Sequence, residues 1–306
     1  MEFIPYPRQE NRPFIQLLYL MLGALGGMFL SMIIGFLIVA VLYGLPFLTD
    51  LSWLNGSSPQ AIGALKILLT AQQIGLFLFP ALLLAITEGK RPAAFYGLRA
   101  PKWQVLGLVL LLMLVSVPMM GGLNALNQKM ELPGFLKGME DWMRRLEEEN
   151  GRTTEAMLKM RSLSDYLGTM LVVAFIPAIC EEFMFRAGLL RILLRWIKNP
   201  HVAIWLGAAI FSTIHFQFFG FFPRLLLGVG FGYMYYWTGS LWYSVFAHFL
   251  NNGFAVTVSW YFQSRGGSID DDMPVQWLVV VFSLIASAYF MNLLKNKGVQ
   301  APSETL

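Results

Sequence analysis

The chain has 306 residues, of which 57% are hydrophobic and 13% charged, and its mean hydropathy is +0.59. Soluble domains carry roughly 25% charged residues, so this composition excludes a soluble globular protein and indicates a membrane protein. The net charge of +4 does not favour a nucleic-acid partner, and the single cysteine, Cys180, excludes an intramolecular disulfide.

Long apolar segments run through most of the chain. A transmembrane helix needs about 20 predominantly apolar residues, and on that basis the sequence predicts an all-α, polytopic integral-membrane bundle of about eight transmembrane helices. These cover roughly residues 15–43, 66–87, 104–125, 166–190, 202–218, 222–238, 241–262 and 274–294. The first apolar run is too long for the core of a signal peptide, so we expect it to be retained as a transmembrane helix.

One substantial polar insert interrupts the apolar segments between residues 126 and 165. Its apolar positions, among them Trp142 and Met157, suggest amphipathic helices at the membrane surface. A solvated linker and a substrate-handling element are both open readings. The predicted organisation is three N-terminal transmembrane helices in 1–130, an extramembrane amphipathic insert in 131–165, a core of transmembrane helices in 166–262, and a last transmembrane helix with a C-terminal tail in 263–306.

The distribution of Lys and Arg over the short loops predicts the orientation in the membrane. Eleven of these residues lie in the two tails and in the loops after the second and fourth predicted helices, against two on the opposite side. Both termini are therefore expected in the cytoplasm and the insert outside. With no organellar targeting signal that we can identify, we expect an integral protein of the bacterial inner membrane.

Three ionisable residues lie together in the fourth predicted helix. A charged residue at the centre of a transmembrane helix costs about 2.5–3.5 kcal/mol on insertion scales, so each marks a candidate functional site. Glu182 and Arg186 are four residues apart and share a helix face, so they can form an ion pair. Glu181 lies about 100° around the helix, and we expect this freer carboxylate to transfer protons. Cys180 beside it is expected to be a packed core residue and not a nucleophile.

Two of the three histidines lie in other predicted helices. His215 is near the end of the fifth, and His248 is in the seventh, four residues before Asn252 and on the same face. A single buried histidine is more often a helix–helix hydrogen-bonding residue than a ligand, and a Glu–Arg pair can simply lock two helices together. Two glutamates, an arginine, two histidines and an asparagine on three helices nevertheless favour a joint site.

These residues carry a resemblance to a known family. "EEFMFR", "FSTIH" and "HFLNN" match the motifs EExxxR, FxxxH and HxxxN, in that order and on successive apolar helices. Over roughly residues 165–260 the chain therefore resembles the CPBP family, which includes the type II CAAX prenyl endopeptidases and their bacteriocin-processing and immunity (Abi-like) relatives. The resemblance implies an eight-helix intramembrane protease that hydrolyses a peptide bond of a protein or peptide in or at the lipid bilayer.

The resemblance also implies a role for each motif residue. Glu181 would be the general base that activates a water together with His215. His248 and Asn252 would stabilise the oxyanion of the tetrahedral intermediate.

Glu182 and Arg186 would hold the first motif in shape. A competing reading makes the protein a metalloprotease, with His215, His248 and a glutamate as ligands of a divalent metal such as zinc. Members of the family are commonly called metalloproteases, yet the sequence contains no HExxH helix.

Two alternatives without hydrolysis stay open at this level. A proton-coupled transporter could relay protons through buried glutamates and histidines, although the outward halves of the predicted helices are nearly free of ionisable residues. A non-catalytic immunity or scaffold protein of the same fold would bind a partner without cutting it. The intact motif positions argue against a degenerate site.

Overall fold

The computed structural model describes residues 10–56, 58–89, 91–266 and 275–298. Its long helical segments are α1 (Pro13–Tyr43), α3 (Pro59–Gln73), η2 (Ile74–Leu78), α4 (Phe79–Thr87), α6 (Trp103–Gln128), α7 (Lys137–Met157), α8 (Leu163–Thr169), η4 (Met170–Phe175), α9 (Ile176–Glu182), η5 (Phe183–Leu190), α10 (Arg191–Ile197), α11 (Pro200–Thr213), α12 (Phe221–Thr238), α13 (Leu241–Ser264) and α14 (Trp277–Gly298). Short helical turns are α2 (Pro46–Thr49), η1 (Ser52–Asn55), α5 (Pro92–Phe95), η3 (Gly134–Leu136) and η6 (Phe218–Gly220).

All regular elements among the described residues are helices, which confirms the predicted all-α, polytopic membrane bundle. Five of them are long and apolar enough to cross a membrane. They are Pro13–Tyr43, Pro59–Thr87, Trp103–Gln128, Leu163–Ile197 and Trp277–Lys297. The other three expected spans are present as helices α11, α12 and α13, of which α11 has only 14 residues. The total of eight crossings therefore stays a prediction.

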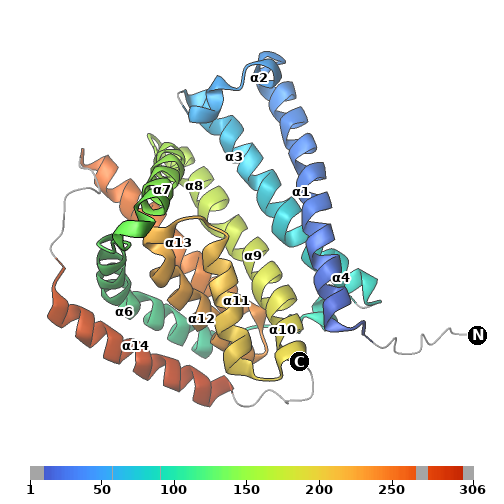
Figure 1. The fold of residues 1–306 in the computed structure, drawn as a ribbon, viewed down its shortest axis with the longest axis vertical. Helices are drawn as coiled ribbons and strands as arrows, with labels where there is room; N and C mark the ends of the chain where they lie inside the picture. Colours follow the sequence, from blue (N-terminus) through green and yellow to red (C-terminus); the bar gives the residue numbers. More distant parts are fainter. Residues whose placement is uncertain (1–9, 57, 90, 267–274, 299–306) are drawn as a thin grey trace, which may run out of the picture.

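The helix that carries the two glutamates occupies the middle of the bundle. In Figure 1, α9 runs between the pair formed by α1 and α3 on one side and α13 on the other. Helices α11 and α12 pack against each other, and α14 packs along α6 on the outside. The central position shields α9 from lipid, so its polar side chains can be satisfied by neighbouring helices.

Helix α1 approaches the second membrane-spanning segment through glycines. A Cβ atom at Gly27 would lie 2.3 Å from the carbonyl oxygen of Gly75, and one at Gly75 would lie 2.4 Å from that of Gly27. Any larger residue would force the two backbones apart. Small residues are the usual means of close helix packing in lipid, where helices gain little from burying apolar surface.

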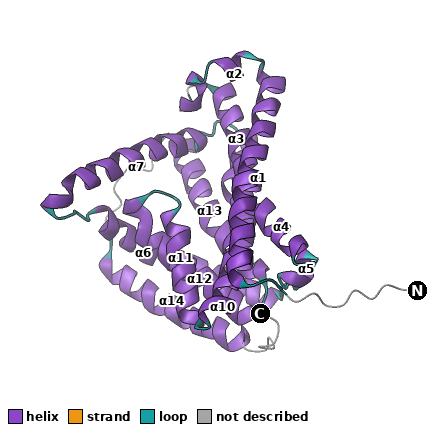
Figure 2. Ribbon diagram, turned by 45° about the vertical axis from the view of Figure 1, so that its right-hand side comes forward, coloured by secondary structure: helices purple, strands orange, loops and turns teal. Residues whose placement is uncertain are grey.

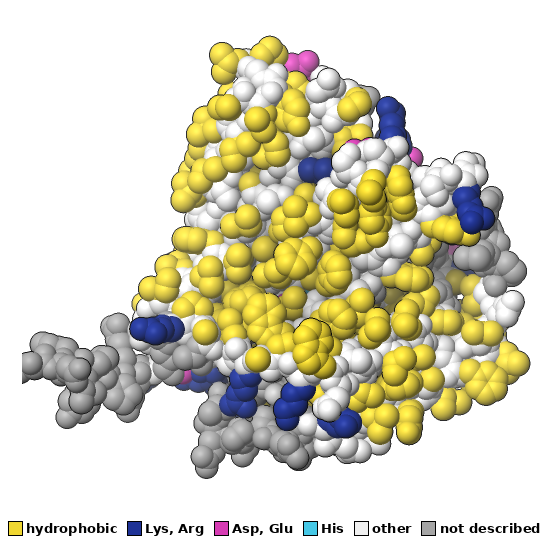
Figure 3. All heavy atoms as spheres, turned by 180° about the vertical axis from the view of Figure 1, so that it is seen from behind, with side chains coloured by type: hydrophobic (Ala, Val, Ile, Leu, Met, Phe, Trp, Pro, Cys, Tyr) yellow, Lys and Arg dark blue, Asp and Glu magenta, His cyan; other side chains and the backbone are white. Residues whose placement is uncertain are grey.

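The outer surface is apolar. Large hydrophobic side chains on α1 and α14 are well exposed, including Phe29, Leu37, Phe282 and Ile285. Seen from behind, hydrophobic side chains cover a broad band of the molecule, and most of the visible Lys and Arg gather at its lower end (Figure 3). This distribution is typical of a bundle whose sides face lipid and whose ends face water.

Helix α7 accounts for most of the predicted polar insert. Figure 2 shows it lying across the bundle, near the ends of α6 and α13, with its axis at a steep angle to theirs. It contacts η6, η1 and α3. The ring of Trp142 lies 5.7 Å from that of Phe218 in η6, and the guanidinium of Arg144 lies 4.2 Å from the ring of Phe219. The insert is thus an amphipathic helix docked on the loop after α11.

Candidate functional site

The segment Leu163–Ile197 is helical throughout but contains two stretches of wider winding. Wider π-helical turns, η4 and η5, lie directly before and after α9. Such turns are rare and occur frequently at functional sites, because the extra residue re-aims the side chains that follow. Glu181 and Glu182 are the last two residues of α9, so they lie between the two π-helical turns.

Pro177 lies at the junction between η4 and α9. A proline has no N–H to offer the carbonyl four residues earlier, which here is that of Val173. Asn252 Nδ2, from α13, donates to the Val173 carbonyl oxygen at 3.3 Å. This hydrogen bond ties Asn252 to the helix of the glutamates.

Glu182 and Arg186 form the ion pair that their spacing indicates. Arg186 Nη1 lies 2.6 Å from Glu182 Oε1, and both residues are buried. The same Glu182 oxygen also accepts a hydrogen bond of 2.9 Å from His248 Nδ1. The pair therefore links α9 and η5 to α13, in addition to fixing the first motif locally.

Aromatic rings and one carbonyl surround the guanidinium of Arg186. Its centre lies 4.5 Å from the ring of Phe211 and 5.3 Å from that of Phe231, and Nη2 donates to the carbonyl of Gly228. Phe231 also stacks on the ring of His248, with centroids 5.5 Å apart. Cation–π contacts and hydrogen bonds offset part of the cost of burying the charge.

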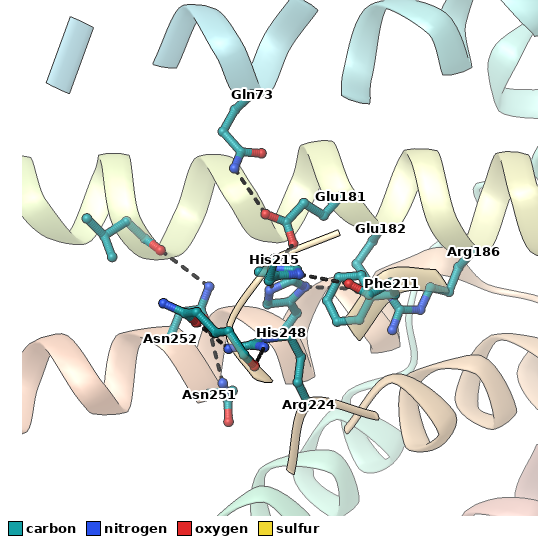
Figure 4. Close-up of polar contacts among 12 residues, drawn as sticks. Gln73, Glu181, Glu182, Arg186, Phe211, His215, Arg224, His248, Asn251 and Asn252 are labelled. Atoms are coloured by element: carbon teal, nitrogen blue, oxygen red, sulfur yellow. Dashed lines mark hydrogen bonds and ion pairs between the residues drawn. The ribbon is translucent and has the colours of Figure 1, made fainter. Parts of the chain in front are cut away.

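Glu181 lies at the centre of the cluster (Figure 4). Gln73 Nε2, at the end of α3, donates to Glu181 Oε1 at 3.0 Å. The second oxygen, Oε2, is buried and has no hydrogen-bond partner among the described residues. It lies 3.8 Å from Nε2 of His215 and 3.8 Å from Nε2 of His248. One carboxylate oxygen is thus held in place, and the other faces two imidazoles without touching them.

The partners of the two Nδ1 atoms determine how the imidazoles face Glu181. His215 Nδ1 lies 2.7 Å from the Phe211 carbonyl oxygen, which can only accept a hydrogen bond. In neutral His215 the proton is therefore on Nδ1, and Nε2 presents a lone pair. His248 Nδ1 donates to Glu182, so the carboxylates of Glu182 and Glu181 lie on opposite sides of this ring.

Glu181, both motif histidines and Asn252 line one cavity of about 360 Å³. Residues of the polar insert, Thr154 and Leu158, also line it. Helix α7 and the turn that follows it therefore form part of the wall of the candidate site.

The structure places all six predicted site residues in one cluster. The face shared by His248 and Asn252 is present, but Asn252 already donates to Val173 and accepts a hydrogen bond from Asn251 Nδ2. Asn251 lines the same cavity. Only part of the amide capacity of Asn252 is thus available to a substrate.

Gln73 and Arg224 also reach the site, and neither belongs to the three motifs. Gln73 lies 108 positions before Glu181 in the chain, and Arg224 lines the cavity from the first turn of α12. Each is a polar residue in an apolar segment, and that is the only sequence signal that could have pointed to them.

The zinc alternative requires His215, His248 and a glutamate to surround one metal ion. No group of three or more His, Cys, Asp or Glu side chains in the described part of the chain is placed to hold a metal ion. Tetrahedral zinc with bonds of about 2.0–2.1 Å brings its ligand atoms to about 3.4 Å from one another. Glu181 Oε2 is 3.8 Å from both imidazole nitrogens, so the donor set does not fit in this arrangement. No step of the reaction proposed below passes through a metal.

Comparisons with known proteins agree with the motifs. Residues 163–254 match the family model described as type II CAAX prenyl endopeptidase Rce1-like. An uncharacterised protein of Bacillus subtilis (strain 168), YpbD, is 27% identical over 106 residues, which is 33% of this chain and 49% of that protein. The match thus spans about half the length of this relative. No solved structure matches the chain. The family resemblance inferred from the three motifs is confirmed for residues 163–254, which contain all six motif residues.

Proposed function

We propose that the protein is an intramembrane endopeptidase that uses a water activated by Glu181 to hydrolyse a peptide bond of a membrane-associated protein or peptide. The observation that carries this proposal is the unpartnered, buried Oε2 of Glu181, 3.8 Å from the Nε2 atoms of both histidines. A water between them would find two or more hydrogen-bond partners, as buried waters require. The Rce1-like match over residues 163–254 supports the same reaction class.

The contacts suggest how that water is oriented. Glu181 Oε2 and the Nε2 lone pair of His215 accept its two hydrogens, which leaves an oxygen lone pair free to attack a carbonyl carbon. Gln73, by holding Oε1, keeps the other carboxylate oxygen aimed at the water. As the C–O bond forms, Glu181 takes one proton. It returns that proton to the amine nitrogen when the C–N bond breaks.

Charge on the tetrahedral intermediate needs hydrogen-bond donors. His248 binds Glu182 through Nδ1 at 2.9 Å and presents Nε2 at 3.8 Å from Glu181, so the Nε2–H of a doubly protonated ring can donate to the oxyanion. Asn252 Nδ2 retains one hydrogen beyond its bond to Val173. In this proposal Glu182 and Arg186 position His248 and do not touch the substrate.

The test compares full-length wild type, Glu181→Gln and Cys180→Ala in liposomes and in cells. Cys180 is the buried neighbour of Glu181 on the same helix, so its substitution controls for disturbed packing. Membrane-protein fragments present with wild type and Cys180→Ala should be absent with Glu181→Gln. Fragments that persist with Glu181→Gln would rule out this mechanism.

Two further measurements address the alternatives. Metal content of the purified protein and cleavage after chelation test the zinc reading, since a water held only by protein groups predicts cleavage that resists chelators. Proton flux in proteoliposomes tests the transporter reading. A cellular phenotype that survives substitution of all six motif residues would favour the non-catalytic scaffold.

A further inference from the structure

Arg224 is the charged residue lining the cavity that the proposed reaction leaves unused. It lines the cavity together with Glu181, His215 and His248, and Figure 4 shows its side chain extending toward the cluster from α12. A charged group at this depth is costly unless it has a partner or a task.

The guanidinium has no acidic partner of its own. Among the described residues no Asp or Glu lies within ion-pair distance of Arg224, whereas Arg186 is paired with Glu182. The charges of Glu181 and Glu147 act on Arg224 from beyond that distance. Its hydrogen bonds go to Gln217, from Nη2 to Oε1 at 2.5 Å and from Nη1 to the carbonyl oxygen at 3.5 Å. Five N–H groups are available on a guanidinium, so most of its donor capacity stays open.

The arginine is also held in a fixed position. Gln217 belongs to the loop between α11 and α12, and this loop is fastened on both sides. Glu147 Oε2 of α7 accepts from the Phe219 N–H at 3.0 Å, while Asn127 Nδ2 of α6 donates to the Phe218 carbonyl at 3.2 Å. A guanidinium that is positioned in advance loses little conformational entropy when it binds a ligand.

From this arrangement we infer that Arg224 forms a carboxylate-binding subsite, which selects substrates carrying an anionic group beside the bond to be cut. A guanidinium fork binds a carboxylate through two parallel hydrogen bonds, and a half-enclosed cavity strengthens the contact. The carboxylate can come from an Asp or Glu side chain or from the end of the substrate chain. This inference rests on the proposed function for the identity of the ligand as a substrate, but binding can be tested without cleavage.

The experiment uses two pairs of fluorescent, N-acylated peptides that contain no other charge. One pair differs only in a free or amidated C-terminus, and the other, amidated, differs only in an internal Glu or Gln. Their affinities are measured for the full-length Glu181→Gln protein in detergent micelles, so that no peptide is cut. Hydrogen bonds to charged groups are stronger than those to neutral groups. We therefore expect the acidic peptide of one pair to bind about 10- to 100-fold more tightly than the neutral peptide of that pair. The pair that shows this ratio identifies the source of the carboxylate.

Adding Arg224→Gln should bring that ratio close to one. Arg152→Gln removes an exposed arginine of α7; it should leave the ratio unchanged and controls for the loss of one positive charge. Arg224→Lys keeps the positive charge but cannot form two parallel hydrogen bonds to a carboxylate, so it should give an intermediate ratio. This variant takes the place of Arg224→Gln if the latter does not fold. Equal affinity within both pairs, including no binding of any peptide, overturns the inference. A ratio that survives Arg224→Gln overturns it too.

Cleavage of the same peptides by protein with Glu181 intact is scored separately. If the acidic peptide binds more tightly but is not cleaved, the carboxylate-binding subsite is supported and the proposed peptidase function is not. Cleavage that falls equally for acid and neutral peptides in Arg224→Gln shows that the arginine acts on Glu181 or on the oxyanion, and this also overturns the subsite.

Discussion

Two Glu–Arg pairs with the same four-residue spacing both bury the glutamate but differ in the exposure of the arginine. Glu182 and Arg186 are buried in the centre of the bundle, at 2.6 Å. Glu140 and Arg144 lie on α7, at 2.9 Å, and the Arg144 side chain is 41% exposed. Identical spacing predicts both pairs equally well, so their difference lies in the third partner of each glutamate.

In the outer pair, the third partner closes a local structure. Glu140 accepts hydrogen bonds from the Leu132 backbone N–H at 3.0 Å and from Lys137 at 3.2 Å, so both of its oxygens are used within one insert. In the central pair, the third partner is His248 from a distant helix, and Glu182 Oε2 is left without a hydrogen bond. The outer glutamate is fully satisfied and structural, whereas the central one is under-satisfied and aims a histidine at the candidate reaction centre.

The largest effect expected from this contrast is on stability. Arg186→Met should lower the free energy of unfolding by about 3–5 kcal/mol, because it leaves the Glu182 carboxylate buried and uncompensated. Denaturant titration in micelles measures the change. The double variant Glu182→Gln with Arg186→Met should recover part of that loss without recovering cleavage, since His248 still lacks its carboxylate. A single-variant loss below about 1 kcal/mol would show that the central pair behaves like a surface pair.

The next effect concerns the residue that holds Glu181. Gln73→Ala should lower kcat by about 10- to 100-fold, because a misdirected general base loses much of its typical 10²–10⁴-fold contribution. KM should change little. Gln73→Glu, which places a second carboxylate beside Glu181, should move the acidic limb of the pH–rate profile to higher pH. The adjacent Gln72→Ala is the matched control. An unchanged pH profile in Gln73→Glu would indicate that Gln73 only packs.

A smaller effect is expected for the outer pair. Arg144→Met should destabilise the protein much less than Arg186→Met, because Glu140 keeps its bonds to Leu132 and Lys137. The comparison uses the same denaturant titration. Equal losses for the two variants would contradict the distinction between structural and site-directed pairs.

The smallest expected effect is a loss of local stability around Glu140 at low pH. Hydrogen bonds from the Leu132 backbone N–H and from Arg144 lower the pKa of Glu140 from 4.5 to about 2. A lowered folded-state pKa gives stability that is present above the unfolded-state pKa and lost as the pH falls through the folded-state pKa. Hydrogen-exchange protection of residues 130–145 should therefore decrease as the pH falls from about 4.5 to about 2, and Glu140→Gln should abolish this dependence. Protection in wild type that is unchanged over this range would refute the role given to Glu140.

The sequence predicts best what depends on one helix. Apolar length locates the membrane segments, and four-residue spacing places Glu182 with Arg186 and His248 with Asn252. It predicts poorly what depends on contacts between helices. Neither Gln73 nor Arg224 stands at a helical spacing from Glu181, so only the packing of α3 against α9, and of α12 against η5 and α13, reveals them.

The motifs also left the direction of each hydrogen bond open. Their order on successive helices indicates that Glu181, His215 and His248 converge. Which Glu181 oxygen is held by Gln73, and which faces the imidazoles, follows only from the side-chain geometry. The same applies to Asn252, whose amide is partly engaged by the Val173 carbonyl.

At Pro177, the stability of the helix and the geometry of the candidate site favour different residues. An alanine at this position would return an N–H to the helix and would ordinarily be a stabilising exchange, since an interior proline costs about 3 kcal/mol. In an α-helix, however, the N–H of that alanine would bond to the carbonyl four residues back, so it would compete with Asn252 for the Val173 carbonyl. Pro177→Ala would thus be expected to make the helix more stable and to loosen the anchor of Asn252, so this single position sets helix stability against the geometry of the site.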